Sequence, residues 1–79
     1  MPSTITVYLR EGCHLCEEAW ELLTHEQKRF GYRLRKVDVD TDTRLAEAYG
    51  QEVPVVTVDG EVRFRGAVNA VLFRRLLRS

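Results

Sequence analysis

The cysteines of this sequence, Cys13 and Cys16, are separated by two residues and are the only two in 79. A strand-like segment precedes the pair and a helix-like segment follows it, so we expect the cysteines at a strand-to-helix turn. At the start of a helix, free backbone N–H groups and the positive end of the helix dipole favour an anion. A thiolate is stabilised there, and the thiolate is the reactive form. We therefore expect a lowered pKa for Cys13, with Cys16 able to close a small disulfide ring.

Charged neighbours of the pair act on such a thiolate in opposite directions. Arg10, three residues before Cys13, adds a positive charge on its side of the turn. Glu17 and Glu18 fall in the first helical turn, where acidic residues favour the helix but raise the cost of a nearby thiolate. Arg10 is thus expected to favour the anion and the two glutamates to oppose it.

The residues around the cysteines also limit which haem or metal sites this C-x-x-C pair could form. Covalent haem attachment needs a histidine directly after the second cysteine, and Glu17 stands there. A zinc site needs four ligands. His25 lies about 13 Å along a helix from Cys16, so His14 and His25 cannot complete one tetrahedron with both thiols in a single chain. Two alternatives stay open: a metal shared between two chains, and buried cysteines without chemistry.

The segments around the cysteines alternate between strand and helix patterns. Residues 4–9 alternate polar and apolar side chains, which predicts a strand. Apolar residues at helical spacing predict a helix from about His14 to Phe30, and Gly31 suits its C-terminus. Residues 32–39 alternate again and predict a second strand. These segments form a β-α-β unit, which implies a right-handed parallel crossover.

The second half of the chain begins with a short helix and a hairpin. Residues 40–49 start with aspartates that are good N-cap candidates, and the helix they predict closes at Gly50. Residues 55–58 and 61–64 flank the dipeptide Asp59-Gly60. That dipeptide tolerates the positive φ angles of a type I′ turn, so the two segments predict an antiparallel hairpin.

The last segment opens at Gly66, and its apolar stripe predicts a third helix. The complete order, β-α-β-α-β-β-α, predicts an α/β fold in which a four-stranded mixed sheet is flanked by three helices. The chain has about half of the roughly 150 residues usual for a domain. We therefore expect residues 1–79 to form one domain.

Composition and charge exclude several classes of protein. Twelve basic and twelve acidic residues cancel, which argues against a nucleic-acid binder. No apolar run approaches the roughly 18 residues of a membrane span. No leader pattern precedes the first strand, so we expect a cytoplasmic protein. Residues 63–79 hold five arginines and no acid; a solvated helix face accounts for this, and a docking surface for an anionic partner is the alternative.

Taken together, these features resemble the glutaredoxin family over essentially the whole chain. The resemblance rests on Cys13-x-x-Cys16 at a helix start after a strand, the β-α-β unit, and Val53-Pro54 ahead of the hairpin and final helix. It is nearest to the compact glutaredoxin-like proteins of bacteria. It implies a thioredoxin-like fold and thiol-disulfide oxidoreductase activity on protein or glutathione mixed disulfides. Cys13 would be the attacking cysteine and Cys16 the resolving one.

The resemblance also implies a substrate site around the cysteines. Pro54 would be a cis-proline that faces the disulfide, and Val53 would offer its backbone N–H and C=O to an extended peptide or to glutathione. Arg10 and the backbone at Gly66 are further substrate-binding candidates. No tightly bound cofactor and no metal are expected, and glutathione is a candidate reductant or co-substrate. We expect a monomer that acts on disulfides and has neither nucleic-acid nor membrane partners.

Three departures from the family pattern lie around this site. His14-Leu15 stands between the cysteines where dithiol glutaredoxins typically have Pro-Tyr, and Arg65-Gly66 replaces a Gly-Gly before the last helix. Asn69 stands near the place of an acid that meets the glutathione amino group. We expect glutathione turnover roughly ten- to a hundredfold below that of the full motif. The alternative function is a metal-binding, iron–sulfur-binding or partner-docking protein without redox turnover.

Overall fold

The structure, a computed structural model, describes residues 3–78 and confirms the predicted β-α-β-α-β-β-α order. Its strands are β1 (Thr4–Leu9), β2 (Arg33–Asp38), β3 (Val55–Val58) and β4 (Glu61–Arg65). Its helices are α1 (His14–Phe30), α2 (Thr43–Tyr49) and α3 (Ala70–Arg78), with one 3-10 turn, η1 (Val39–Thr41), before α2. Over these residues, no helix combines the length and apolar character that crossing a membrane requires.

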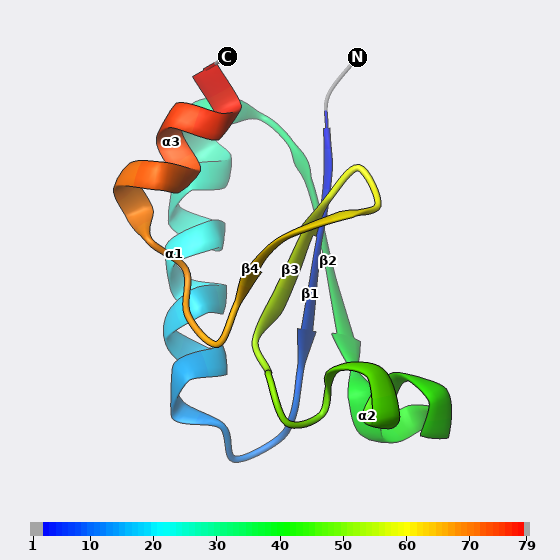
Figure 1. Ribbon diagram of the computed structural model, residues 1–79. Coiled ribbons are helices and arrows are strands. Elements are labelled where there is room, and N and C mark those ends of the chain that lie inside the picture. The colour runs from blue at the N-terminus through cyan, green and yellow to red at the C-terminus, as the bar shows by residue number, and fades with distance from the viewer. Residues whose placement is uncertain (1–2, 79) are drawn as a thin grey trace.

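The sheet is mixed, and its strand order is β2-β1-β3-β4. β1 pairs with β2 in parallel, as a β-α-β unit requires, and β3 pairs with both β1 and β4 in antiparallel fashion. Figure 1 shows α1 and α3 together on one side of the sheet, with α2 on the other side where β1 and β2 end. The C-terminal ends of β1 and β2 therefore share one edge of the molecule with the start of α1.

The core lies between the sheet and the helices α1 and α3. Its fully or almost fully buried members come from both layers: Ile5, Val7, Leu23, Tyr32, Val56 and Phe73. The Tyr32 hydroxyl donates a hydrogen bond to the Leu23 carbonyl oxygen. Burial, and after it the nearby Glu26 carboxylate, raise the pKa of Tyr32 well above its usual value. This phenol therefore stays neutral and hydrogen-bonded inside the core.

The hairpin turn and the end of α1 use glycine with a positive φ angle, as the sequence predicts, whereas the glycine that ends α2 has a negative φ angle. Asp59 and Gly60 have φ angles of 51° and 86°, which suits the predicted type I′ hairpin turn. Gly31 ends α1 in the left-handed conformation, with its N–H on the Gln27 carbonyl. Gly50 ends α2 in the right-handed conformation, with φ −54°. Its missing side chain matters because a Cβ would collide with a carbonyl oxygen of α2 and with the Arg10 guanidinium.

The third helix begins later than the sequence predicts. Gly66 has φ 79°, and its N–H donates to the carbonyls of Glu52 and Pro54, each at 2.9 Å, so the chain turns there before any helix starts. The N-terminal cap of α3 is Asn69, whose side-chain oxygen accepts the Leu72 N–H at 3.0 Å. Residues 66–69 are thus a loop, which corrects the prediction that they form the first turn of the helix.

Candidate active site

The two cysteines lie at the start of α1, where the sequence predicts them. Cys13 is the N-cap residue, in an extended conformation, and its sulfur accepts the Cys16 N–H at 3.2 Å. A disulfide joins the two residues, and their Cα atoms are 5.2 Å apart. Cys13 is half-buried, whereas only 2% of Cys16 is exposed. The pair therefore presents one accessible sulfur, with the second sulfur behind it.

A tight turn after β1 places Cys13 in this position. Gly12 has φ 79°, a conformation that other residues adopt only with strain. The Cys13 N–H then reaches back to the Arg10 carbonyl at 3.3 Å, and the Glu17 N–H donates to the Cys13 carbonyl as the first helical bond, at 3.2 Å. The glycine in the turn thus sets the angle at which α1 leaves the sheet.

The Val53–Pro54 peptide bond is cis, as the family resemblance implies. Pro54 is fully buried, Val53 is half-buried, and β3 starts at the next residue. Because Val55 pairs with Tyr8, the Val53-Pro54 loop lies at the same end of the sheet as the turn that carries the cysteines. Direct contact between Pro54 and the sulfur of Cys13 stays a prediction.

Arg10 is tied to its own chain. Its Nε and Nη2 atoms donate to the two carboxylate oxygens of Asp40, each at 3.0 Å, and its Nη1 donates to the Gly50 carbonyl at 3.0 Å. The hydrogen bond between the two side chains raises the pKa of Arg10 and holds the pKa of Asp40 below its usual value. Asp40 therefore neutralises the positive charge of Arg10, which we expect from the sequence to stabilise a thiolate at Cys13. Arg10 acts as a brace between β1 and the end of α2.

The arginines near the C-terminus also pair mostly with acids of the same chain. Three of those in the described part of the segment 63–79 form ion pairs: Arg63 with Glu61, Arg65 with Glu52, and Arg74 with Glu26. Glu26 is almost fully buried, and its Oε1 lies 2.5 Å from the Arg74 Nε, so this pair links α1 to α3. The cluster thus mainly stabilises the fold, and little of it is free for an anionic partner.

The backbone of the last loop is less available than the sequence suggests. Gly66 is a substrate-binding candidate because a free N–H there could meet an anion, but that N–H already donates to two carbonyl oxygens. At the start of α3, the Asn69 side chain meets the Leu72 N–H. The Gly66 N–H is therefore already hydrogen-bonded within the chain, and a role of this backbone in substrate binding stays a prediction.

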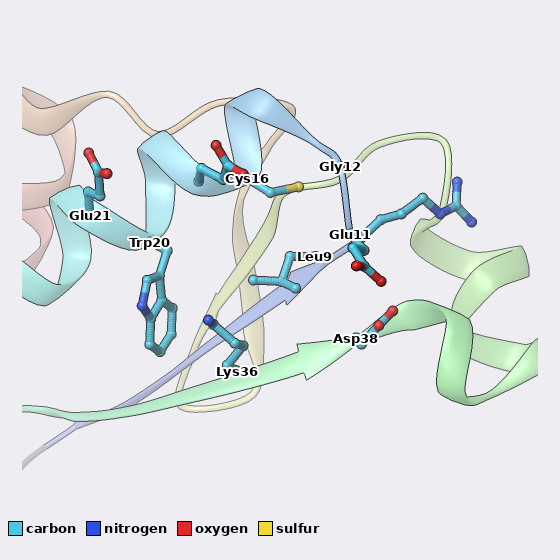
Figure 2. A pocket seen from close by; sticks show the side chains of 10 residues that line it. Leu9, Glu11, Gly12, Cys16, Trp20, Glu21, Lys36 and Asp38 are labelled. Atoms are coloured by element: carbon cyan, nitrogen blue, oxygen red, sulfur yellow. The ribbon is translucent and has the colours of Figure 1, made fainter.

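A groove runs beside Cys16, and no pattern in the sequence predicts it. It has a volume of about 420 Å³ and lies between α1 and the strands β1 and β2, lined by Leu9, Arg10, Glu11, Gly12, Cys16, Glu17, Trp20, Glu21, Lys36 and Asp38. Figure 2 shows Trp20 and Lys36 together at one end, and Glu11 and Asp38 toward the Gly12 end. The Lys36 Nζ lies 4.4 Å from the centre of the Trp20 ring. The spacing of these residues along the chain does not predict that they lie together, because their contact depends on how α1 packs on β2.

A metal site has no ligand set in the described part of the chain. Within residues 3–78, no group of three or more His, Cys, Asp or Glu side chains is placed to hold an ion. His14, between the cysteines, lies exposed on α1 with its Nε2 3.1 Å from Glu18. A metal bound at Cys13 and Cys16 would therefore need further ligands, such as those of a second chain.

Comparisons with known proteins agree with this geometry. Residues 4–77 match the model of the family described as glutaredoxin-like domain (DUF836). The solution structure of protein Ne2328 from Nitrosomonas europaea is similar at a TM-score of 0.82 and 28% identity, over 96% of this chain and 92% of that one. The crystal structure of XcR50 from X. campestris is similar at a TM-score of 0.76 and 34% identity, over 94% of this chain and 95% of that one.

More distant structures share the fold alone. Thioredoxin from Fasciola hepatica superposes with a TM-score of 0.66 at 20% identity, over 98% of this chain and 79% of that one. A comparison with curated proteins gave no match. The architecture is therefore thioredoxin-like.

Proposed function

Because the chain belongs to the glutaredoxin-like domain family and its fold brings Cys13 and Cys16 within disulfide distance, we propose that it is a thiol-disulfide oxidoreductase. The observation that carries the proposal is the asymmetry of the pair. Cys13 is a half-buried N-cap residue whose sulfur accepts a backbone N–H, and Cys16 is buried behind it. Such an arrangement suits one attacking thiol and one resolving thiol.

The reaction moves two electrons from the dithiol to a substrate disulfide. The Cys13 thiolate attacks one substrate sulfur, the substrate S–S bond breaks, and the other substrate sulfur leaves as a thiolate that takes a proton from water. The Cys16 thiolate then attacks the Cys13 sulfur, which re-forms the Cys13–Cys16 disulfide and releases the second substrate thiol. An external thiol reductant, such as glutathione or a protein dithiol, restores the reduced pair.

Neighbouring backbone supports both thiolate and substrate in this proposal. The Cys16 N–H, 3.2 Å from the Cys13 sulfur, stabilises the attacking anion, since hydrogen bonds to charged groups are stronger than neutral ones. Val53, before the cis bond, offers its backbone to an extended segment of the substrate by strand-like pairing. Both interactions use main-chain groups rather than specific side chains.

Alkylation of the reduced protein tests the assignment of roles. With limiting iodoacetamide near neutral pH, Cys13 should be modified first, because Cys16 is 2% exposed. Cys13→Ser should abolish reduction of insulin disulfides, and Cys16→Ser should retain the first step and accumulate a mixed disulfide on Cys13. Preferential labelling of Cys16 contradicts the roles. An iron–sulfur absorption band in freshly purified protein, without disulfide reduction, favours the metal-binding alternative.

Glutathione is proposed as a weak substrate. Arg65 is paired with Glu52 beside the Val53-Pro54 loop, and Asn69 offers no charge to the glutathione ammonium. Losing a charge-assisted hydrogen bond costs about 1.5–3 kcal/mol where the group is desolvated, and less at an exposed site. Arg65→Gly combined with Asn69→Asp should therefore raise activity on a glutathione mixed disulfide.

The double variant should retain the N-cap of α3, because aspartate caps a helix as well as asparagine does. The insulin-reduction rate is the control and should change little. Wild-type turnover equal to that of an ordinary glutaredoxin, or a double variant without gain, would show that these two positions do not limit glutathione use.

A further inference from the structure

The groove beside Cys16 carries acidic side chains that its own chain does not neutralise. Glu11, Glu17 and Glu21 line it, and none of them has an ion-pair partner among residues 3–78. Five acids elsewhere in the fold are paired with basic side chains, namely Glu18, Glu26, Asp40, Glu52 and Glu61, whereas Asp42, Glu47 and Asp59 lie singly outside the groove. Uncompensated negative charge therefore collects at the groove, although the whole chain is neutral.

Part of the groove lining is apolar, so a matching ligand needs apolar surface as well as a charge. Leu9, the Cys16 side chain and Trp20 line it together with the carboxylates, around a volume of about 420 Å³. A long basic side chain matches this combination, because its aliphatic stem covers apolar surface while the charged head stays with carboxylates and water. The shape and charge together favour arginine or lysine.

The position of Lys36 shows that one end of the groove already holds a cation, which leaves the other end for a second one. Its Nζ lies over the Trp20 ring, so that end already holds a positive charge. The other end, toward Gly12, has the carboxylates of Glu11 and Asp38 (Figure 2). The Arg10 guanidinium also lines the groove, but it is already paired with Asp40. The end nearest the cysteines is thus the end with acid in excess.

We propose that this groove binds an arginine or lysine side chain of a protein substrate, close in sequence to the substrate cysteine. The inference rests on the proposed function, because the substrate must form its mixed disulfide on Cys13. Cys16 forms part of the groove wall, and its Cα lies 5.2 Å from that of Cys13. Residues that flank the mixed disulfide therefore reach the groove. Basic protein disulfides are the preferred substrates, and glutathione, with its two carboxylates, is disfavoured on this side.

Trp20 provides a binding assay that does not depend on turnover, because it is the single tryptophan of the chain and lines the groove. The oxidised protein is titrated with two short peptides that carry serine in place of cysteine and differ at one nearby position, arginine or glutamate. The arginine peptide should change the Trp20 fluorescence and bind roughly tenfold more tightly at low salt. The preference should shrink in about 1 M salt, where the Debye length falls to roughly 3 Å.

Adjacent residues on α1 supply a matched control. Glu11→Gln combined with Glu17→Gln removes two groove carboxylates near the cysteines, and both side chains are exposed and form no ion pair in the described chain, so the fold should be retained. The preference should fall to about twofold. Glu18→Gln removes the same kind of charge from the other side of α1, where Glu18 lies with Leu15 and Ala67, and should leave the preference nearly unchanged.

Reduction of the matching disulfide peptides is measured separately, so that the two proposals fail in different ways. Arginine-selective binding that depends on Glu11 and Glu17, with neither peptide disulfide reduced, supports the groove and refutes the oxidoreductase. Equal binding of both peptides, with both reduced at equal rates, overturns the groove and leaves the oxidoreductase standing. A preference for the glutamate peptide, or an equal effect of Glu18→Gln, also overturns the groove assignment.

Discussion

Phe73 is the residue through which α3 is anchored, and shortening it should remove a large part of the protein's stability. It is fully buried, and it is the buried residue of α3. Its ring centre lies 5.7 Å from that of Tyr32, 6.3 Å from that of Phe64 and 6.4 Å from that of Phe30. Truncation of a core phenylalanine to alanine costs about 3–5 kcal/mol, from lost burial and from the cavity left behind.

This loss is large for a chain of 79 residues. At about 0.05–0.15 kcal/mol per residue, the expected free energy of unfolding is roughly 4–12 kcal/mol. Phe73→Ala should therefore remove at least a quarter of the stability. It should lower the melting temperature by about 12 °C or more, since 1 kcal/mol corresponds to roughly 4–8 °C at this size.

Urea unfolding of the oxidised protein, followed by Trp20 fluorescence and by far-UV circular dichroism, measures the effect. Leu72→Ala is the matched control, because Leu72 is the preceding residue of α3 and is 52% exposed. Its loss should be about 1 kcal/mol or less. The slope of the unfolding free energy with urea should stay constant in both variants. An equal or larger loss for Leu72→Ala would refute the packing of α3 through Phe73.

Three shorter predictions concern the ion pairs and the turn at Gly50. Because the hydrogen bond from Arg10 lowers the pKa of Asp40, this pair should stabilise the fold above about pH 4 and lose its effect as the pH falls through that lowered pKa. Asp40→Asn should flatten the fall in melting temperature on acidification below about pH 4, and an unchanged acid profile would contradict this. Gly50→Ala should lower the melting temperature, although alanine favours helices, because the new Cβ collides with a carbonyl oxygen of α2 and crowds the Arg10 guanidinium; a higher melting temperature would be the opposite result. Arg74→Met should cost roughly 1–3 kcal/mol in urea unfolding because it leaves the Glu26 carboxylate buried without its cation, whereas Glu26→Gln should cost less.

The local elements around the cysteines could be predicted from the sequence. The helix from His14 to Phe30 and its end at Gly31 agree with the structure, as does the hairpin turn at Asp59-Gly60. These features depend on apolar periodicity and on the φ angles that glycine tolerates, both of which are properties of a few consecutive residues. The placement of Cys13 at a helix N-terminus follows from them.

The cis bond at Pro54 was predicted in a different way. Intrinsic preference leaves only about 5–6% of X-Pro bonds cis in folded proteins, so the residues around Pro54 do not decide the isomer. The prediction came from the combination of Cys13-x-x-Cys16 with Val53-Pro54, which marks the family. Family resemblance supplied what local chemistry could not.

Only the tertiary structure decided how the long-range ion pairs form and where the groove lies. Arg10 meets Asp40 across 30 positions, and Arg74 meets Glu26 across 48. The groove exists because α1 packs over β1 and β2 and leaves Trp20 beside Lys36. Charged side chains are long and their attraction acts over several ångströms, so their partners are selected by which surfaces meet after folding rather than by distance along the chain.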